Sequence, residues 1–511
     1  MGEGAYPEGL RRWLVLTVVI VGTFMAVLDV TIVNVVLPKI MSAFGANVKQ
    51  VQWVSTAFMI ATAVSMPATG WLGRRFGLGR LYLAELLVFS IGSALCTVAW
   101  SLDALVAARV VQALGAGAIM PTSMAIITDT FPPRERGRAL GIWGVGFMVG
   151  PAIGPTLGGY LTDWFNWRAV FAVNLPVGLV AMLLTALVLR ENRPDRSSNF
   201  DWKGFLTLGV FLVVGLLTLD SGQEQGWNSQ IILLGMASTA LALVLFVLMV
   251  WDSPHPVMPL HLFRSTEYSM TMLLSTLRAC GFFGALFLLP IFLQTVQGRD
   301  TIDTGLLLVP GAVTVAIFMP VAGILTDRIG PRWPTVFGVL LMVYSLYLYH
   351  SLDVVVSRWD VIYPQIWRGV AVTFLMTPVN TAAMNAVPRE EAGNASWMIN
   401  LTMTVGGAFT IALMGSLLYR ETLTQMDLLG EGTFRRALPP ELIHQARGLG
   451  FSSSESGALA RALMVRHVSR SATVLAFQYL FMLLGLITSL GLLPALFLSK
   501  RGKAAKPAQE G

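Results

Sequence analysis

Charged side chains are scarce in this chain. Only 12% of its 511 residues are Asp, Glu, Lys or Arg, whereas 55% are hydrophobic, and the mean hydropathy is +0.68. Soluble domains carry about twice that share of charge, so a soluble globular fold is excluded. The apolar runs are long and continuous, which also excludes the alternating strands of an outer-membrane barrel. The composition therefore predicts an all-α polytopic membrane protein.

Cysteine and histidine are rare as well. The two cysteines, Cys96 and Cys280, stand in separate apolar runs and lack the spacing of metal ligands, so neither a disulfide framework nor a zinc site is expected. The five histidines fall in connections or at the ends of apolar runs: His255, His261, His350, His444 and His467. An intramembrane enzyme would need paired catalytic groups at depth, so we predict no metal site and no enzymatic activity.

A nucleotide-binding loop is also missing. No segment of the type Gly-x-x-x-x-Gly-Lys occurs, which argues against ATP as a direct energy source. We therefore expect no cofactor and take the proton gradient as the alternative. The net charge of +7 does not indicate a nucleic-acid partner, because Lys and Arg concentrate in short connections, where they orient a membrane protein.

About fourteen apolar runs are long enough to cross a bilayer. The expected spans cover residues 13–37, 52–73, 81–100, 104–128, 138–160, 169–189, 204–220, 231–250, 269–294, 305–325, 334–351, 361–385, 396–418 and 472–498. Basic residues gather in the even-numbered connections, so the positive-inside rule predicts that both termini are cytoplasmic.

Two polar segments divide this series. A charged break covers residues 190–203, and a long connection on the outer side covers 419–471, where Ala458 to Val468 is expected to form an amphipathic surface helix. We therefore expect four parts in the chain. They are an N-terminal six-helix bundle (1–190), two linker helices (191–268), a C-terminal six-helix bundle that includes the connection 419–471 (269–499), and a cytoplasmic tail (500–511).

A short repeat indicates that the two bundles are duplicates. Gly70-x-Leu72-x-x-Arg75-x-Gly77 follows the second span, and Gly323-x-Leu325-x-x-Arg328-x-Gly330 follows the tenth. Both lie on the same predicted side of the membrane. Parallel halves of this kind are typical of secondary transporters that hold substrate between them.

Asp29 is a carboxylate deep in the first apolar run. A charge inside a bilayer is unfavourable by several kcal/mol, so such acids usually face a cavity and carry protons, ions or substrate. Asp29 lies about 12 Å and Arg109 about 9 Å below the outer surface, which predicts that the two side chains pair and that Asp29 stays ionised until a proton or substrate intervenes. Two alternatives stay open: Asp29 snorkels outward, or Arg109 binds backbone carbonyls.

Four motifs occur in order on the first five spans. They are Leu28-Asp29-x-Thr31-Ile32-Val33-Asn34-x-x-Leu37-Pro38, Gln52-Trp53-Val54-Ser55-Thr56-Ala57, Arg109-x-x-Gln112-x-x-Gly115-x-Gly117 and Gly146-x-x-x-Gly150-Pro151-x-x-Gly154-Pro155-x-x-Gly158-Gly159. With them the chain resembles the major facilitator superfamily, and within it the fourteen-helix drug:proton antiporters of the EmrB/QacA type. The resemblance covers nearly all of residues 10–418 and implies two six-helix bundles plus two extra transmembrane helices.

The resemblance also implies a function and a location. It implies multidrug efflux of hydrophobic or amphiphilic toxic compounds across the bacterial cytoplasmic (inner) membrane in exchange for protons, and it implicates Arg109 in proton transfer. We therefore expect Asp29 to bind and release these protons with the help of Arg109. The repeated loops would latch the outward-facing state. Because Arg74 replaces the usual acid in the first copy, we expect the second copy, with Asp327, to be the effective latch.

The glycine-proline run has two interpretations. In the resembled family it marks antiporters, but glycines four residues apart also allow plain tight packing between helices, and the prolines bend the helix. The residues expected to carry conformational change are Gly70, Arg75, Gly77, Gly146, Gly150, Pro151, Gly154, Pro155, Gly158, Gly159, Gly323, Asp327, Arg328 and Gly330.

A substrate cavity is expected among polar, aromatic and Met residues of the spans. Its expected lining is Phe24, Met25, Asn34, Trp53, Gln112, Phe147, Arg278, Phe282, Arg368 and Met398. Two arginines without an acid in the later spans favour neutral or anionic amphiphiles, although Arg278 and Arg368 could equally tie helices together. Glu85 is expected to pair with a neighbouring arginine, Arg74, Arg75 or Arg80.

The sequence is also consistent with other functions. The chain could export one endogenous metabolite, lipid or siderophore, or act as a membrane sensor. Relatives with an extended outer connection can work with a periplasmic adaptor and an outer-membrane channel, so the connection 419–471 is expected either to bind such partners or to act as a lid or spacer.

Overall fold

The computed structural model describes residues 10–189, 199–434 and 453–499, which form helices and no strands. A chain in lipid must satisfy its backbone polar groups internally, and helices do so. The first bundle comprises α1 (Leu10–Phe44), α2 (Val48–Ser65), α3 (Ala68–Phe76), α4 (Leu78–Thr97), α5 (Leu102–Thr130), α6 (Arg136–Trp164), α7 (Ala169–Ala172) and α8 (Asn174–Val188).

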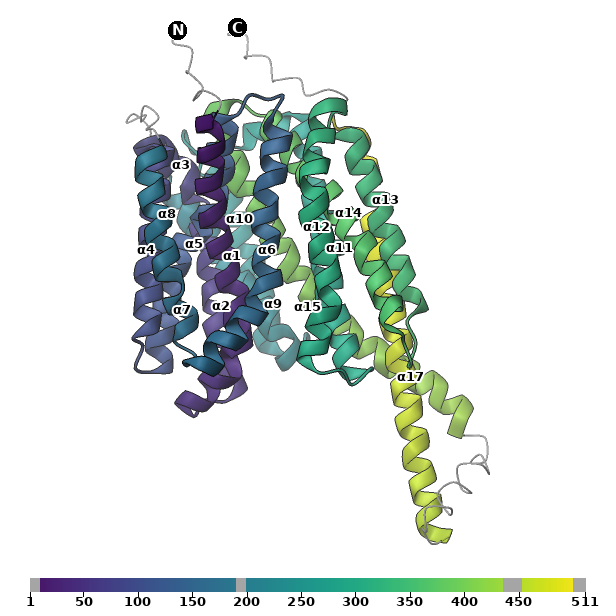
Figure 1. Cartoon of the computed structure of the whole chain (residues 1–511). Helices are drawn as coiled ribbons and strands as arrows, with labels where there is room; N and C mark the ends of the chain where they lie inside the picture. The colour runs from purple at the N-terminus through teal and green to yellow at the C-terminus, as the bar shows by residue number, and fades with distance from the viewer. Residues whose placement is uncertain (1–9, 190–198, 435–452, 500–511) are drawn as a thin grey trace.

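The extra helix pair and the second bundle follow. The pair is α9 (Trp202–Gln225) and α10 (Gln230–Trp251). The second bundle comprises α11 (Thr266–Thr295), α12 (Thr301–Ile329), α13 (Arg332–Leu348), α14 (Arg358–Asn385), α15 (Ala392–Phe434), α17 (Ser453–Ser489) and α18 (Leu492–Leu496). Figure 1 shows these helices side by side in one upright bundle.

The predicted all-α polytopic fold is confirmed. Among the described residues, ten helices are long and apolar enough to cross a membrane, and twelve if each of two bent pairs counts as one span. The helices α13 and α14 occupy the places of the eleventh and twelfth expected spans. The count of fourteen is consistent with this arrangement and stays a prediction.

The two copies of the short repeat end alike. Gly77 terminates α3 and Gly330 terminates α12, with φ of 89° and 82°, a region in which side chains other than glycine are strained. Each glycine N–H donates back to the preceding helix, to Gly73 O or Thr326 O. The repeat therefore encodes the same helix ending twice.

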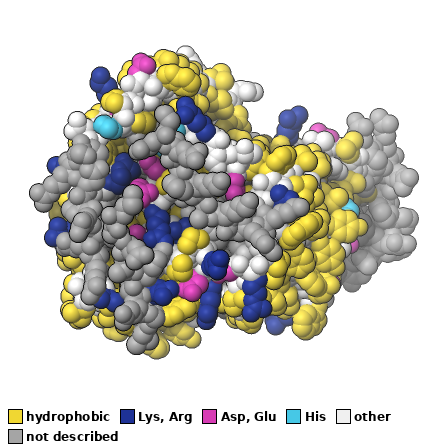
Figure 2. Space-filling view, turned by 90° about the horizontal axis from the view of Figure 1, so that it is seen from above, with side chains coloured by type: hydrophobic (Ala, Val, Ile, Leu, Met, Phe, Trp, Pro, Cys, Tyr) yellow, Lys and Arg dark blue, Asp and Glu magenta, His cyan; other side chains and the backbone are white. Residues whose placement is uncertain are grey.

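One end of the bundle carries the start of the first helix and the end of the last (Figure 1). We call it the basic end, because the helix ends and connections there hold Arg74, Arg134, Arg138, Arg328 and Arg332. Figure 2 looks onto this face and shows many Lys and Arg side chains among fewer acids.

The expected polar connection 419–471 is helical in its described parts, 419–434 and 453–471, which corrects the prediction of a loop. α15 continues without a break to Phe434, α17 begins at Ser453, and Figure 1 shows α17 projecting beyond the bundle. The stretch Ala458 to Val468 is thus in line with the last span and is not a surface helix. A drop in hydropathy ends a membrane span but not a helix, because most residues here are good helix formers. Residues 190–198, 435–452 and 500–511 lie outside the described part.

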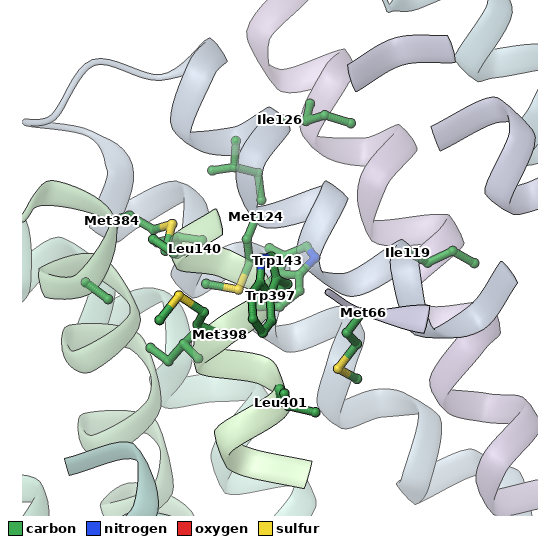
Figure 3. Close-up of a cluster of buried hydrophobic side chains, with 14 of the residues drawn as sticks. Met66, Ile119, Met124, Ile126, Leu140, Trp143, Met384, Trp397, Met398 and Leu401 are labelled. Carbon is green, nitrogen blue, oxygen red and sulfur yellow. The ribbon is translucent and has the colours of Figure 1, made fainter. Parts of the chain in front are cut away.

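The two halves are closed against each other at the basic end. α6 and α12 meet there at glycines: a Cβ on Gly141 would lie 2.6 Å from Met319 O, and one on Gly137 would lie 2.7 Å from Gly323 O. Ser396 Oγ of α15 also donates to Pro121 O of α5 over 2.6 Å. Beside these contacts, buried side chains from both halves form one apolar cluster (Figure 3): Met66, Met124, Leu140, Trp143, Met384, Trp397, Met398 and Leu401.

Candidate functional site

Asp29 is fully buried inside the first bundle, with an exposed fraction of 0%. Arg109 Nη1 donates to Asp29 Oδ2 over 2.5 Å. Gln112 Nε2 and Asn174 Nδ2 donate to Asp29 Oδ1 over 2.8 and 2.7 Å. The predicted contact between Asp29 and Arg109 is therefore confirmed, and the snorkelling alternative is wrong.

Arg109 does more than pair with the acid. Nη1 also donates to Gln112 Oε1 over 2.6 Å, and Nε donates to the backbone carbonyl of Val54 over 3.2 Å. The guanidinium carbon lies 3.8 Å from the centre of the Phe58 ring. The alternative of a carbonyl ligand thus holds alongside the ion pair. A buried pair with this many hydrogen bonds is the kind that offsets its own desolvation.

Five helices contribute to this arrangement. We call Asp29, Ser93, Arg109, Gln112 and Asn174 the Asp29 cluster; they lie on α1, α4, α5 and α8, while Val54 comes from α2. Ser93 Oγ accepts from Gln112 Nε2 over 2.7 Å. Sequence reasoning missed Ser93 and Asn174, whose only signal is a polar residue in an apolar run. It also expected Gln112 in the substrate cavity, whereas Gln112 is 0% exposed and binds Asp29.

Glycines bring the helices of this cluster close together. A Cβ on Gly92 of α4 would overlap the backbone of Gln112, and one on Gly115 of α5 would lie 2.5 Å from the carbonyl oxygen of Glu85. The close approach of α4 and α5 lets Gln112 of α5 donate to Ser93 of α4.

The glycine run of α6 faces the helix that carries Asp29. Cβ atoms on Gly146, Gly150, Gly154 and Gly158 would press on Ile20, Leu28 N, Thr31 Oγ1 and Ile32 of α1, whereas Gly159 has no such neighbour within 4 Å. The helix bends by 44° between its segments Arg136–Pro151 and Thr156–Trp164, which confirms the predicted bend. Pro151 is exposed, and the side chain of Pro155 lies outside the described part. A role of this run in export stays a prediction.

The second copy of the repeated loop makes the predicted charge–helix contact. Asp327 Oδ1 accepts from Gly137 N over 2.8 Å, and Oδ2 accepts from Arg138 N over 2.7 Å. Both amides lie in the first turn of α6, the positive end of its helix dipole. Arg75 is half-buried and Arg328 exposed.

The first copy of the loop lacks that contact. Gly70 packs directly against Asn394 at the start of α15, but Arg74 replaces the acid, and its Nη1 is buried without a hydrogen-bond partner. Asn394 donates instead to Glu391 over 2.5 Å. The prediction that the second copy carries the contact is confirmed, and its role as a latch stays a prediction.

A cavity of about 620 Å³ lies between the halves, toward the end opposite the basic end. It is lined by Asn34, Leu37, Pro38, Met41, Val48, Val51, Gln52, Ser55, Thr56 and Met59 of the first half, by Leu216, Leu219 and Asp220 of α9, and by Phe287, Ala408, Ile411 and Ala412 of the second half. Ser55 Oγ donates to Asn34 Oδ1 over 3.0 Å. The two halves are therefore separated by a cavity toward this end, whereas they are in direct contact at the basic end.

Of the ten residues expected to line a substrate cavity, only Asn34 lines this one. Met25 and Met398 are buried in the apolar core, Phe24, Phe147 and Phe282 are half-buried, and Trp53 is exposed. Periodic Met and aromatic residues in a helix bundle mainly pack against one another, which is why they did not identify this cavity. Contact of these side chains with substrate stays a prediction.

Arg278 and Arg368 line neither this cavity nor the apolar crevice described below. Arg278 of α11 donates to the carbonyls of Leu375 and Met376 over 3.3 and 3.2 Å, and to Asn380 Oδ1 over 2.9 Å. These acceptors surround Pro378, where α14 lacks an amide donor. Arg368 Nε donates to Gln365 over 2.8 Å. Arg278 thus ties helices together, the second of the two alternatives.

Glu85 does not pair with an arginine, which corrects the sequence analysis. It is 4% exposed, its Oε1 accepts from Thr122 over 2.6 Å, and its Oε2 has no partner. The helical phase of α4 turns this residue inward toward α5, away from the arginines of the preceding loop. No three His, Cys, Asp or Glu side chains among the described residues are grouped to hold a metal ion.

Comparison with known proteins identifies the family of this chain. Residues 19–411 match the family model of the Major Facilitator Superfamily. The chain is 28% identical to an uncharacterized transporter of that type, YhcA of Bacillus subtilis, over 100% of this chain and 97% of the relative. It is 34% identical to a multidrug resistance protein B homolog of Mycobacterium tuberculosis (82% and 78% covered) and 30% identical to the multidrug export protein EmrB of Escherichia coli (89% and 90%).

Solved structures agree on the fold. The human organic anion transporter MFSD10 superposes with a TM-score of 0.62 at 15% identity, covering 93% of this chain and 99% of that chain. The proton:xylose symporter XylE superposes with a TM-score of 0.59 at 14% identity, covering 96% and 97%. The chain belongs to the major facilitator superfamily and, within it, to the EmrB type of multidrug transporter.

Proposed function

We propose that this protein is a proton-coupled antiporter that exports hydrophobic or amphiphilic toxic compounds by alternating access. The observation that carries the proposal is the buried Asp29 cluster, in which one carboxylate faces one guanidinium at 2.5 Å. A proton that binds Asp29 removes one of two opposite charges, so the state of the pair depends directly on proton occupancy. The proton gradient then supplies the energy, without a cofactor.

The helices around Asp29 offer a route from this proton to the rest of the molecule. When Asp29 is neutral, Arg109 still donates to Gln112 and to Val54 O, but its ion pair with Asp29 of α1 is lost. The helix α1 packs on the glycine run of α6, and the start of α6 binds Asp327 of α12. Protonation would thus loosen α1 and, through α6, the contact between the halves at the basic end.

The orientation follows from the same proposal. The basic end faces the cytoplasm, with both termini on that side of the bacterial inner membrane. The halves are closed at the basic end and leave the 620 Å³ cavity toward the other end, which corresponds to an outward-facing state. Asp29 is sealed from both sides in this state, with an exposed fraction of 0%.

The test is transport by Asp29→Asn in proteoliposomes. The variant keeps the shape of the side chain but cannot titrate, so drug-driven proton flux should fall to background. Asp163→Asn, an exposed acid at the end of α6, is the matched control and should transport normally. Undiminished, proton-coupled flux in Asp29→Asn would contradict the proposal.

The same assay separates the remaining alternatives. Competition among chemically unrelated drugs is expected for a multidrug exporter and not for an exporter of one metabolite, lipid or siderophore. A membrane sensor would give no flux at all. The proposal also includes a periplasmic adaptor and outer-membrane channel that bind the connection 419–471, so deletion of 425–465 should reduce resistance without loss of insertion.

A further inference from the structure

The cavity between the halves contains one charged side chain that comes from neither half. Asp220 lies on α9, five residues before the end of that helix, and is exposed toward the cavity. Thr56 Oγ1 of α2 donates to Asp220 Oδ2 over 3.4 Å. The extra helix pair therefore places a carboxylate against the wall that the first half provides.

The surroundings of Asp220 are amphipathic. Among the described residues that line the cavity, Asp220 is the sole charge, and the amide and hydroxyl groups are Asn34, Gln52, Ser55 and Thr56. The rest of the lining is apolar. A cavity of about 620 Å³ suits a drug-sized molecule, which typically binds an apolar wall with a few placed polar groups.

A second cavity adjoins this one along the same helix. It is an apolar crevice of about 800 Å³ between the α9–α10 pair and α15, and its lining includes Trp227, Phe246 and Trp397. Leu216 and Leu219 of α9 line both cavities, and Ala408 of the first adjoins Phe409 of the second along α15. One turn of α9 thus separates the apolar crevice, which suits the apolar part of a ligand, from the carboxylate of Asp220, which suits a positive charge.

From this arrangement we propose that Asp220 binds the cationic group of the substrate, and that the extra helix pair makes this transporter selective for monocationic amphiphiles. The inference rests on the proposed function and adds its substrate class. It replaces the expectation of neutral or anionic substrates, because that expectation depended on Arg278 and Arg368, which lie outside the cavity. One carboxylate carries one negative charge, so dications are expected to bind no better than monocations.

The test is binding to the purified full-length protein in detergent micelles, measured by calorimetry with two probes of matched shape. Tetraphenylphosphonium carries one positive charge and triphenylphosphine oxide carries none. Asp220→Asn should weaken binding of the cation by about fivefold, the upper range for an ion pair open to solvent. Binding of the neutral probe should not change. Salt should weaken cation binding to the wild type but not to Asp220→Asn.

Two further variants sharpen the result. Asp220→Glu should restore cation binding, and Asp163→Asn, which removes an exposed acid outside the cavity, should leave both probes unaffected. Equal cation binding by the wild type and Asp220→Asn overturns this inference alone, as long as the wild type exports either probe against protons. If the wild type neither binds nor exports either probe, the proposed function fails, and this inference fails with it.

Discussion

The two halves of the molecule hold their buried arginines in different ways. In the first half, Arg109 donates to a carboxylate, an amide and one backbone carbonyl. In the second half, Arg278 donates to two backbone carbonyls and an amide, with no carboxylate. A carboxylate is an ionisable group, but a carbonyl is not. The Arg109 site therefore contains a second ionisable group, whereas Arg278 is bound by dipoles alone.

The corresponding helices α5 and α14 show the same contrast. Arg109 and Gln112 of α5, and Gln365 and Arg368 of α14, are pairs three residues apart that hydrogen-bond to each other, with the order of the two types exchanged. Among the described residues, the first pair also reaches an acid, Asp29, and the second pair reaches none. In the proposed mechanism, Asp29 is what makes the first pair responsive to protons.

Helix packing differs between the halves in the same direction. α6 meets α1 through four glycines spaced four residues apart. Its counterpart α15 meets α11 through Gly406 and Gly407, where a Cβ on Gly406 would lie 3.2 Å from Ala279 Cβ. The helix that carries Asp29 thus packs directly on the backbone of α6 along four successive turns, and such close packing leaves little room for either helix to move alone.

The largest expected effect is that of removing the cation in the first half. Arg109→Met leaves Asp29 buried without a charge partner and should lower the free energy of unfolding by about 3–5 kcal/mol. Arg278→Met leaves only dipolar acceptors unpaired and should lower it by about 1–3 kcal/mol. Reversible unfolding in mixed detergent micelles measures both values.

The double variant Asp29→Asn with Arg109→Met is the control for this contrast. It removes both charges and should recover part of the loss, as a double-mutant cycle would report. If Arg109→Met and Arg278→Met were equally destabilising, the two arginines would be equivalent scaffolding and the contrast between the halves would be wrong.

The next effect concerns the glycine run of α6. A Cβ on Gly154 would overlap Thr31 Oγ1, so Gly154→Ala should lower the free energy of unfolding by about 1–3 kcal/mol through overpacking and should slow transport. Gly159→Ala, with open space around it, should stay within about 0.5 kcal/mol of the wild type. Gly406→Ala should lower the free energy of unfolding by an intermediate amount. If Gly406→Ala were as destabilising as Gly154→Ala, the proposed difference in packing between the halves would be wrong.

The sequence predicted the Asp29–Arg109 pair because helix rise alone places both residues at one depth. It did not predict Asn174 or Ser93, because their contact with the pair depends on how α4 and α8 rotate, and rotation is set by packing between helices rather than by local pattern. Glu85 shows the same limit: the nearby arginines suggested a pairing along the chain, whereas the helical phase turns this acid toward Thr122.

Hydropathy predicted the order of the spans well and the polar segments less well. The connection 419–471 was expected to be a loop because its residues are polar, yet α15 continues to Phe434 and α17 begins at Ser453. The cavity between the halves was harder still to predict. Asp220 falls at the predicted end of its span, so the sequence alone could not show that it faces this cavity.

The smallest expected effect lies in the two repeated loops. Asp327→Asn removes a negative charge from the start of α6, an interaction of about 0.3–1 kcal/mol, and should raise the population opened at the basic end by about twofold to fivefold. Arg74→Asp places an acid at the start of α15, where the first loop now lacks one, and should lower that population. Spin labels on Arg134→Cys and Glu390→Cys, in a background without Cys96 and Cys280, report the distance across this end.

These two variants test whether the loops differ by one side chain or by their whole surroundings. If the acid alone makes a latch, Arg74→Asp should offset Asp327→Asn in the double variant, because both act on the same equilibrium between closed and open basic ends. If Arg74→Asp has no effect while Asp327→Asn opens the basic end, Asn394 and Glu391 already satisfy the start of α15. The first loop would then contribute only packing through Gly70, and the loop of the second half alone would hold the basic end closed.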